Sequence, residues 1–197
     1  MMSQLLWSTS LNQEKMLESD LYYKKINQTS TFLYDYCNSA IKNLSEDKRK
    51  DLPYLAGFRS VRINKDIFLK DSVLKKINDK FDIQLASILI LEKNIGINFH
   101  VDSFRKVTIN MLLSSGISHS VFKEREKLDN PYQFKLQELI FEKKFFYLYN
   151  VSEEHCVLNF DKPRFMFSLK FRDNDLTYNE VFDWCKENNM FESTYNE

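Results

Sequence analysis

The chain has 197 residues, of which 43% are hydrophobic and 15% aromatic, so it can bury a substantial core and a disordered chain is disfavoured. Lysine and arginine together number 28, as do aspartate and glutamate, and this balance gives no overall field that favours nucleic acid or an anionic membrane. The three cysteines, Cys37, Cys156 and Cys185, lie far apart without a CxxC pair, which argues against a disulfide framework or structural zinc and favours a reducing, cytoplasmic setting.

Only three glycines and three prolines punctuate the chain, so its elements are predicted from periodicity. Residues 1–50 are predicted to form a helical N-terminal extension with a break at residues 28–31, because apolar residues recur at helical spacing in "EKMLESDLYYKK" and "TFLYDYCNSAIKNL". The segment "DKRKDLPY" is predicted to be a solvated linker. "AGFRSVRIN" then indicates a strand, and "DIFLKDSVLKKINDKF" a helix capped by Asp66.

After Phe81 the sequence changes to short β-like runs separated by turn signals. We expect strands over residues 82–94, 105–115, 119–123, 133–141, 145–151, 155–159 and 164–172. Many short strands favour a sandwich or barrel over a parallel sheet. The expected fold is mainly β with flanking helices, a double-stranded β-helix (jelly roll, cupin-like). We expect one domain over residues 1–197, with a β core and an inserted helix over 55–172 and a C-terminal helix over 177–190.

The stretch "INFHVDSFRK" contains the first two of three candidate metal ligands. In an extended strand, residues i and i+2 point to the same side, so His100 and Asp102 can present an imidazole and a carboxylate toward one point. The third candidate is His155, at the start of a strand that can lie beside the first in an antiparallel fold. Two histidines and one carboxylate are the arrangement used for non-haem Fe(II), and zinc could fit the same ligands. His119 has no partner at ligand spacing and is expected at the surface.

Arg164 is the candidate for binding an anionic ligand. It lies nine positions after His155, across the turn "NFDKP", so a hairpin can bring it back beside the metal site. Its guanidinium would enter an apolar strand, where an unpaired cation is costly. A bound carboxylate, held by two parallel hydrogen bonds, could supply the partner, as could Asp161 or water if the arginine is exposed.

The order "HVD", then "H", then "R" resembles the Fe(II)- and 2-oxoglutarate-dependent oxygenases over about Ile88 to Phe171. The short members, including relatives of the aspartyl/asparaginyl β-hydroxylases and small phage and bacterial oxygenases, are the most similar. The resemblance implies that His100, Asp102 and His155 bind Fe(II) and that Arg164 binds the distal carboxylate of 2-oxoglutarate, with O2 as the second cosubstrate. It also disfavours a halogenase, because related halogenases replace the carboxylate ligand with a small residue.

Other positions are compared with the same family. Many relatives place a serine or threonine two residues after the arginine, whereas this chain has Met166 there and a hydroxyl only at Ser168, which we do not count as a ligand. Arg105 and Asn110 resemble polar positions that face the cosubstrate or substrate in short members. The alternatives are a solvent-facing arginine at the rim and a strand asparagine with satisfied hydrogen bonds.

The resemblance therefore implies a dioxygenase that hydroxylates a small molecule or an amino-acid or peptide side chain and releases succinate and CO2. Neither a nucleic-acid nor a membrane partner is expected, and the oligomeric state is not predicted. Two alternatives stay open. One is a cupin-type metal enzyme that does not use 2-oxoglutarate, and the other is a non-catalytic interaction module whose N-terminal helices bind a partner.

Overall fold

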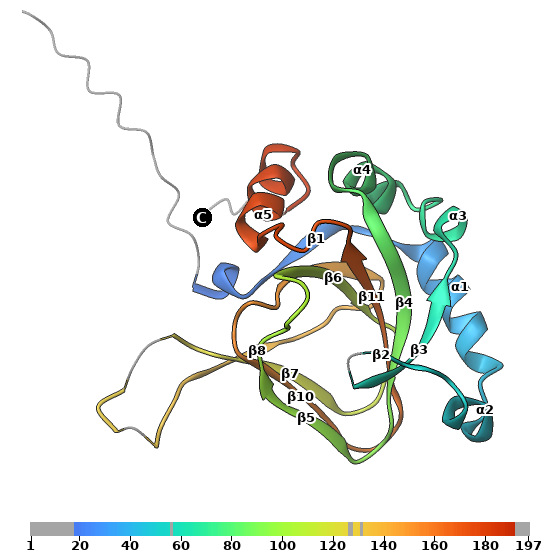
Figure 1. The fold of residues 1–197 in the computed structure, drawn as a ribbon, viewed down its shortest axis with the longest axis horizontal. Helices are drawn as coiled ribbons and strands as arrows, with labels where there is room; N and C mark the ends of the chain where they lie inside the picture. Colours follow the sequence, from blue (N-terminus) through green and yellow to red (C-terminus); the bar gives the residue numbers. More distant parts are fainter. Residues whose placement is uncertain (1–17, 56, 126–127, 131, 192–197) are drawn as a thin grey trace, which may run out of the picture.

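The computed structural model describes residues 18–55, 57–125, 128–130 and 132–191 (Figure 1). Its helical elements are η1 (Glu18–Leu21), α1 (Thr31–Lys42), α2 (Glu46–Lys50), α3 (Lys65–Phe68), α4 (Ser72–Phe81) and α5 (Tyr178–Glu187). Its strands are β1 (Tyr23–Thr29), β2 (Tyr54–Leu55), β3 (Phe58–Ile63), β4 (Ile83–Leu91), β5 (Ile95–His100), β6 (Val107–Leu112), β7 (Ser118–Lys123), β8 (Leu136–Leu139), β9 (Phe145–Asn150), β10 (His155–Asn159) and β11 (Arg164–Phe171).

The strands from β4 to β11 form one long antiparallel hairpin that is coiled on itself. β7 pairs with β8, β6 with β9, β5 with β10 and β4 with β11, so the pairings are nested. The chain passes between two sheets as it coils: a seven-stranded sheet of order β1-β9-β6-β11-β4-β3-β2 and a four-stranded sheet of order β5-β10-β7-β8. This topology is the jelly roll that the sequence predicts, with β1, β2 and β3 added at the edges of the larger sheet.

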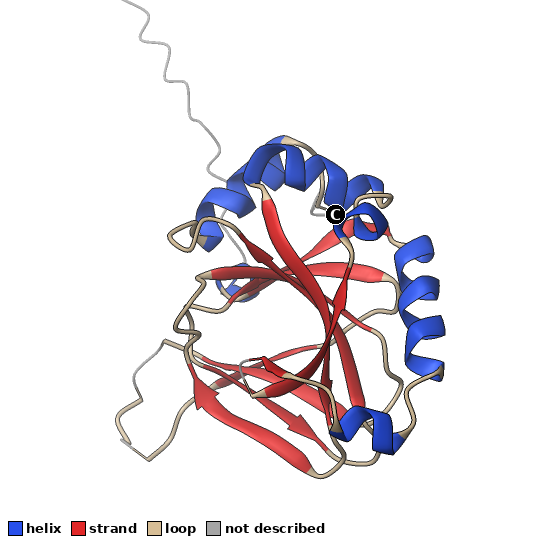
Figure 2. Cartoon of the chain, turned by 45° about the vertical axis from the view of Figure 1, so that its right-hand side comes forward, coloured by secondary structure: helices blue, strands red, loops and turns tan. Residues whose placement is uncertain are grey.

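The helices α1, α3, α4 and α5 cover the face of the seven-stranded sheet that is turned away from the four-stranded sheet (Figure 2). The main hydrophobic core therefore lies between this sheet and the helices. Leu33 of α1, Ile77 of α4 and Val181 of α5 are fully buried there, together with Phe167 of β11. Because this layer buries most of the large apolar side chains, the space between the two sheets can hold polar groups.

The predicted N-terminal helix is wrong over residues 23–29, which form strand β1. β1 pairs with β9, with Tyr23 opposite Tyr149, and the backbone N–H of Asn27 donates to the carbonyl oxygen of Met190. These partners are distant in sequence, so tertiary pairing overrides the local helical pattern. The predicted helix over "TFLYDYCNSAIKNL" is confirmed as α1, while the call over residues 1–17 lies outside the described residues.

Two further local predictions differ from the structure. The predicted linker "DKRKDLPY" contains α2, which is capped by the Ser45 hydroxyl, and strand β2. The predicted single helix after residue 65 is divided into α3 and α4. Asn64 caps α3, and the Asp71 carboxylate accepts from the backbone N–H groups of Val73 and Leu74 to start α4. A new N-cap in mid-segment ends one helix and begins the next. The C-terminal helix is confirmed as α5.

The structure also bears on membrane insertion. Within the part of the chain that the structure describes, no helix is both long and apolar enough to cross a bilayer.

The contribution of β1 to the core can be measured by truncating Ile26, whose side chain is fully buried. We expect Ile26→Ala to lower the free energy of unfolding by about 2–4 kcal/mol, because it removes buried methylene groups and leaves a cavity. Asn27→Ala, at an exposed side chain of the same strand, should change it by less than about 0.5 kcal/mol. Urea denaturation followed by circular dichroism measures both, and equal values for the two variants would contradict a structural role for β1.

Candidate active site

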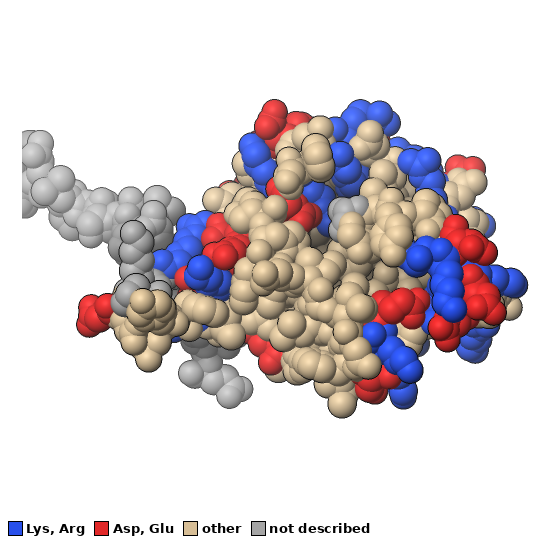
Figure 3. Space-filling model, turned by 60° about the horizontal axis from the view of Figure 1, so that its bottom comes forward, with Lys and Arg blue, Asp and Glu red and all other residues tan. Residues whose placement is uncertain are grey.

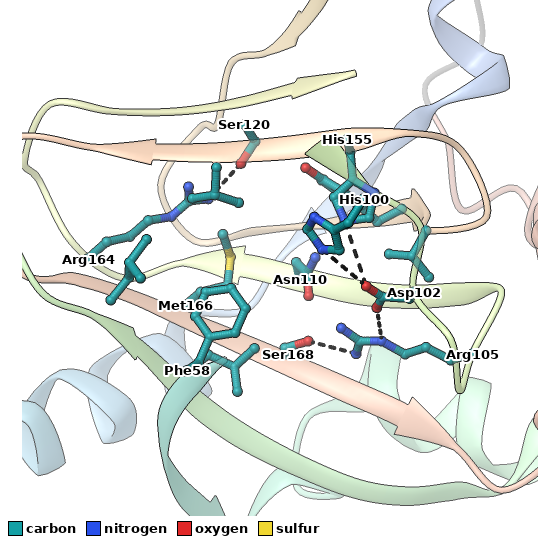
Figure 4. A pocket seen from close by; sticks show the side chains of 15 residues that line it. Phe58, His100, Asp102, Arg105, Asn110, Ser120, His155, Arg164, Met166 and Ser168 are labelled. Carbon is teal, nitrogen blue, oxygen red and sulfur yellow. Dashed lines mark hydrogen bonds and ion pairs between the residues drawn. The ribbon is translucent and has the colours of Figure 1, made fainter. Parts of the chain in front are cut away.

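A cavity lies between the two sheets, and the predicted site residues meet in it (Figure 4). Strands of both sheets and the β5–β6 loop contribute to it. Its lining residues are Phe58, Leu89, Leu91, His100, Asp102, Arg105, Asn110, Ser120, Tyr149, Val151, His155, Val157, Arg164, Met166 and Ser168. All six residues that sequence analysis selected therefore line one cavity.

The two imidazoles are brought together by strand pairing. His155 at the start of β10 lies directly opposite His100 at the end of β5, and the ring centroids are 4.4 Å apart. The Nδ1 atom of His100 is 2.7 Å from the carbonyl oxygen of Asn98, and that of His155 is 2.8 Å from the carbonyl oxygen of Glu153. A carbonyl oxygen can only accept, so each Nδ1 carries the proton. In the neutral form of each imidazole, the Nε2 atom then carries the lone pair that can bind a metal ion.

Asp102 faces both histidines from the loop that follows β5, not from a strand. β5 ends at His100, and the backbone N–H of Asp102 donates to the carbonyl oxygen of Val151. Asp102 Oδ1 is 3.4 Å from His100 Nε2 and 3.9 Å from His155 Nε2. The expectation that His100 and Asp102 share one strand is thus wrong in detail, although the two side chains do converge.

Arg105 holds the other oxygen of Asp102. Its Nε donates to Asp102 Oδ2 at 2.7 Å, while its Nη1 donates to Thr108 Oγ1, Ser168 Oγ and the carbonyl oxygen of Leu169. These bonds tie the β5–β6 loop to strands β6 and β11. The guanidinium therefore fixes which oxygen of Asp102 faces the histidines, and the two hydroxyls contribute by positioning Arg105.

The electrostatics of the site keep Asp102 ionised and His155 neutral. Burial raises the pKa of Asp102, but the hydrogen bond with His100 and the charge of Arg105 outweigh burial and hold this pKa at about 2. Burial lowers the pKa of His155, which favours the neutral imidazole that metal binding requires. The pKa of the more exposed His100 is raised, mainly by its hydrogen bond with Asp102.

The three side chains form a donor set that can hold a metal ion. The ligand atoms of His100, Asp102 and His155 all lie within 4.8 Å of one another. Two neutral imidazoles and one carboxylate suit Fe(II) and leave coordination positions open for other ligands. The hydrogen bonds that both Nδ1 atoms donate and the one that Asp102 Oδ2 accepts are second-layer contacts of the kind that orient metal ligands.

Arg164 lies deeper in the same cavity and is only 3% exposed. Its Nη2 donates to Ser120 Oγ at 2.7 Å, and its Nη1 donates to the carbonyl oxygen of His119 at 3.3 Å. No carboxylate among the described residues pairs with it, and burial lowers its pKa to about 10. A buried cation without a counter-charge is costly, and an anionic ligand could offset that cost.

Sequence analysis did not identify Ser120 as a residue of the site. Ser120 lies on β7 opposite Val157 of β10, a register that sequence alone does not give. Tyr149 is buried against His155, with ring centroids 5.8 Å apart, and burial raises its pKa to about 12. Asn110 lies opposite Ser168 on neighbouring strands, and both face the cavity. His119 points away and contacts Glu138 on the outer surface.

Comparison with solved structures identifies the fold. HygX from Streptomyces hygroscopicus, solved with nickel, 2-oxoglutarate and hygromycin B, aligns with a TM-score of 0.55 at 12% identity over 85% of this chain and 90% of that one. A prolyl hydroxylase from Trichoplax adhaerens, in complex with a hypoxia inducible factor peptide, aligns with a TM-score of 0.53 at 13% identity, over 79% of this chain and 87% of that one. The viral collagen prolyl hydroxylase of Paramecium Bursaria Chlorella virus-1, as its 2OG complex, aligns with a TM-score of 0.51 at 11% identity, over 75% of this chain and 94% of that one.

The chain therefore has the double-stranded β-helix fold of these enzymes, as the sequence predicts. No protein-family model matches the chain. No curated protein matches it in sequence either.

The three histidines of the chain provide a matched test of the metal site. We expect His100→Ala and His155→Ala each to weaken Co(II) binding by more than about 100-fold, because each removes one of three ligands. His119→Ala should bind as the parent does, since its ring lies on the outer surface. Competition with a chromogenic chelator measures the affinities and circular dichroism checks the fold. The same affinity in all three variants would rule out this site.

Arg105 allows a test of positioning. Arg105→Ala is expected to weaken Co(II) binding by about 10–100-fold, because Asp102 loses the hydrogen bond that fixes its orientation. Arg62→Ala removes an exposed arginine of β3 and should leave the affinity unchanged. The chelator competition used for the histidine variants gives both values. If the two arginine variants bind equally well, Arg105 does not position the carboxylate.

Proposed function

We propose that this chain is an Fe(II)- and 2-oxoglutarate-dependent oxygenase that hydroxylates a small molecule or an amino-acid side chain. The observation that carries the proposal is the placement of Arg164. A buried guanidinium without a carboxylate partner lines the same cavity as a two-histidine, one-carboxylate donor set. A dicarboxylate that reaches from the metal to this arginine would satisfy both halves of the site. The similarity in fold to structures solved with 2-oxoglutarate supports this assignment.

His100, Asp102 and His155 would hold the iron. When bound, iron, 2-oxoglutarate and O2 would supply the oxidation. One oxygen atom of O2 would enter succinate as 2-oxoglutarate loses CO2, and the other would convert a C–H bond of the substrate to C–OH. The ionised Asp102 offsets part of the metal charge. Arg105 donates to Asp102 Oδ2, so Oδ1 would be the oxygen available to the metal.

Arg164 would bind the distal carboxylate of 2-oxoglutarate. Charge-assisted hydrogen bonds from a guanidinium to a carboxylate are strong and directional. Ser120 already accepts from Nη2, which fixes the guanidinium in place before the ligand binds. The apolar side chains of Leu91, Val157 and Met166 surround this end of the cavity and limit its hydration. The chain thus orients the cosubstrate and keeps water away from it.

The direct test is spectroscopic. Fe(II) and then 2-oxoglutarate are added to metal-free protein under anaerobic conditions, and we expect the visible metal-to-ligand charge-transfer band of a chelated complex. The band should be absent in His100→Ala and present in His119→Ala. Metal binding without a band would overturn the use of 2-oxoglutarate and favour a cupin-type or zinc enzyme. Failure to bind either would overturn the oxygenase assignment.

Replacing Arg164 separates cosubstrate binding from stability. We expect Arg164→Met to raise the 2-oxoglutarate concentration needed for half of the charge-transfer signal by more than about 100-fold, because the carboxylate loses its charged partner. The free energy of unfolding should stay the same or rise, since an apolar side chain replaces an uncompensated buried cation. Titration of the band and urea denaturation measure the two quantities. An unchanged titration would show that the carboxylate binds elsewhere.

A further inference from the structure

A second compartment adjoins the proposed cosubstrate cavity. It shares His100, Asp102, Arg105 and Ser168 with that cavity, so the proposed metal site lies where the two meet. The second compartment extends from there toward the β2–β3 hairpin and the β5–β6 loop. A molecule bound in it would lie next to the proposed iron without displacing a ligand from Arg164.

Strand β11 places one cation in each compartment. Alternate residues of a strand share one face, so Arg164, Met166, Ser168 and Lys170 all point between the sheets, where they line the two compartments. Arg164 lines only the first compartment and Lys170 only the second. The Cα atoms of these two residues are roughly 20 Å apart for a strand of this length. The combined cavity therefore has a basic group at each end of this strand.

Lys170 has no partner for its charge among the residues that the structure describes. It is half-buried, and its ammonium forms no hydrogen bond or ion pair with any residue in the described ranges. Asp102 is the only acid among the described residues that line the second compartment, and its Oδ2 is already bonded to Arg105. Of the described residues that line the compartment, Lys170 therefore provides the unpaired positive charge.

The remaining walls are largely apolar. Phe58, Leu85 and Leu89 rise from the sheet, and Leu55 and Phe104 lie at the mouth. The side chain of Phe104 is 75% exposed, so a hydrophobic surface at the entrance is uncovered. Figure 3 shows the molecule hollowed on the side turned forward, with basic side chains beside the hollow. A ligand that covers Phe104 and Leu55 would gain free energy by removing apolar area from water.

We infer that this compartment binds the substrate, and that the substrate is an apolar acid: a hydrocarbon or aromatic body that carries one carboxylate. The apolar body contacts Phe58, Leu89 and Phe104, and the carboxylate pairs with Lys170. The C–H bonds nearest the metal are then those of the body, at a distance from the carboxylate set by Lys170. This inference rests on the proposed function for the reaction, although binding of the acid does not require the reaction.

The test uses phenylalkanoates of increasing chain length, with the corresponding neutral amides and cationic amines as matched probes. Isothermal titration is carried out anaerobically with Fe(II) and 2-oxoglutarate bound, and again with metal-free protein. We expect the acids to bind more tightly than the amides, and Lys170→Met to weaken acid binding by about tenfold while leaving amide binding unchanged. Lys170→Glu should reverse the preference toward the amines. Lys80→Met, an exposed lysine of α4, is the control and should behave as the parent.

The outcomes separate this inference from the proposed function. Absence of acid binding across the series, or equal binding of acids and amides, overturns the inference even if the charge-transfer band forms. The inference is likewise overturned if Lys170→Glu does not shift the binding preference from acids to amines. Conversely, Lys170-dependent acid binding in metal-free protein that never gives the band supports the anion-binding compartment and overturns only the oxygenase assignment.

Discussion

The two-residue period of the strands in the larger sheet is the constraint on which both core and site depend. On β11, Phe167, Leu169 and Phe171 face the helices and belong to the main core. Arg164, Met166 and Ser168 alternate with them and face the cavity. Because the helices bury the apolar face, the other face is free to carry charge. The coiled hairpin then brings a second sheet over that polar face and closes it into a cavity.

The two arginines that line this cavity differ in how their charge is balanced. Arg105 is compensated by Asp102, and the pair is locked by hydrogen bonds to two strands, so it belongs to the permanent structure of the site. Arg164 has only neutral acceptors, so the cost of removing its charge from water is not offset by a counter-charge. That asymmetry supports the proposed roles of Arg164 as the residue for a ligand and of Arg105 as the residue that orients Asp102. Sequence analysis had left Arg105 open between the cosubstrate, the substrate and solvent.

Sequence was most informative where a local pattern and the tertiary structure agree. The strands within residues 145–171 have clear β-like runs, in which His155 and Arg164 stand out as an imidazole and a cation. His100 and Asp102 were selected by their i, i+2 spacing. It failed for β1, whose "YKKINQT" becomes a strand only by pairing with β9. Lys170 was missed for a related reason: its parity with Arg164 is visible in sequence, but the hairpin and loop that enclose it are not.

At Met166 the chain departs from the family pattern, and strand pairing supplies the missing hydroxyl from another position. In many relatives, as noted for the resemblance, a hydroxyl lies two positions after the arginine, on the same strand. Here Met166 is apolar, and the hydroxyl bonded to Arg164 comes from Ser120 on β7, in the opposite sheet. The guanidinium thus bridges the two sheets at the closed end of the cavity. A neutral acceptor that orients the arginine and leaves its charge available is thus supplied from a different strand, so Met166 does not argue against the proposed anion-binding site.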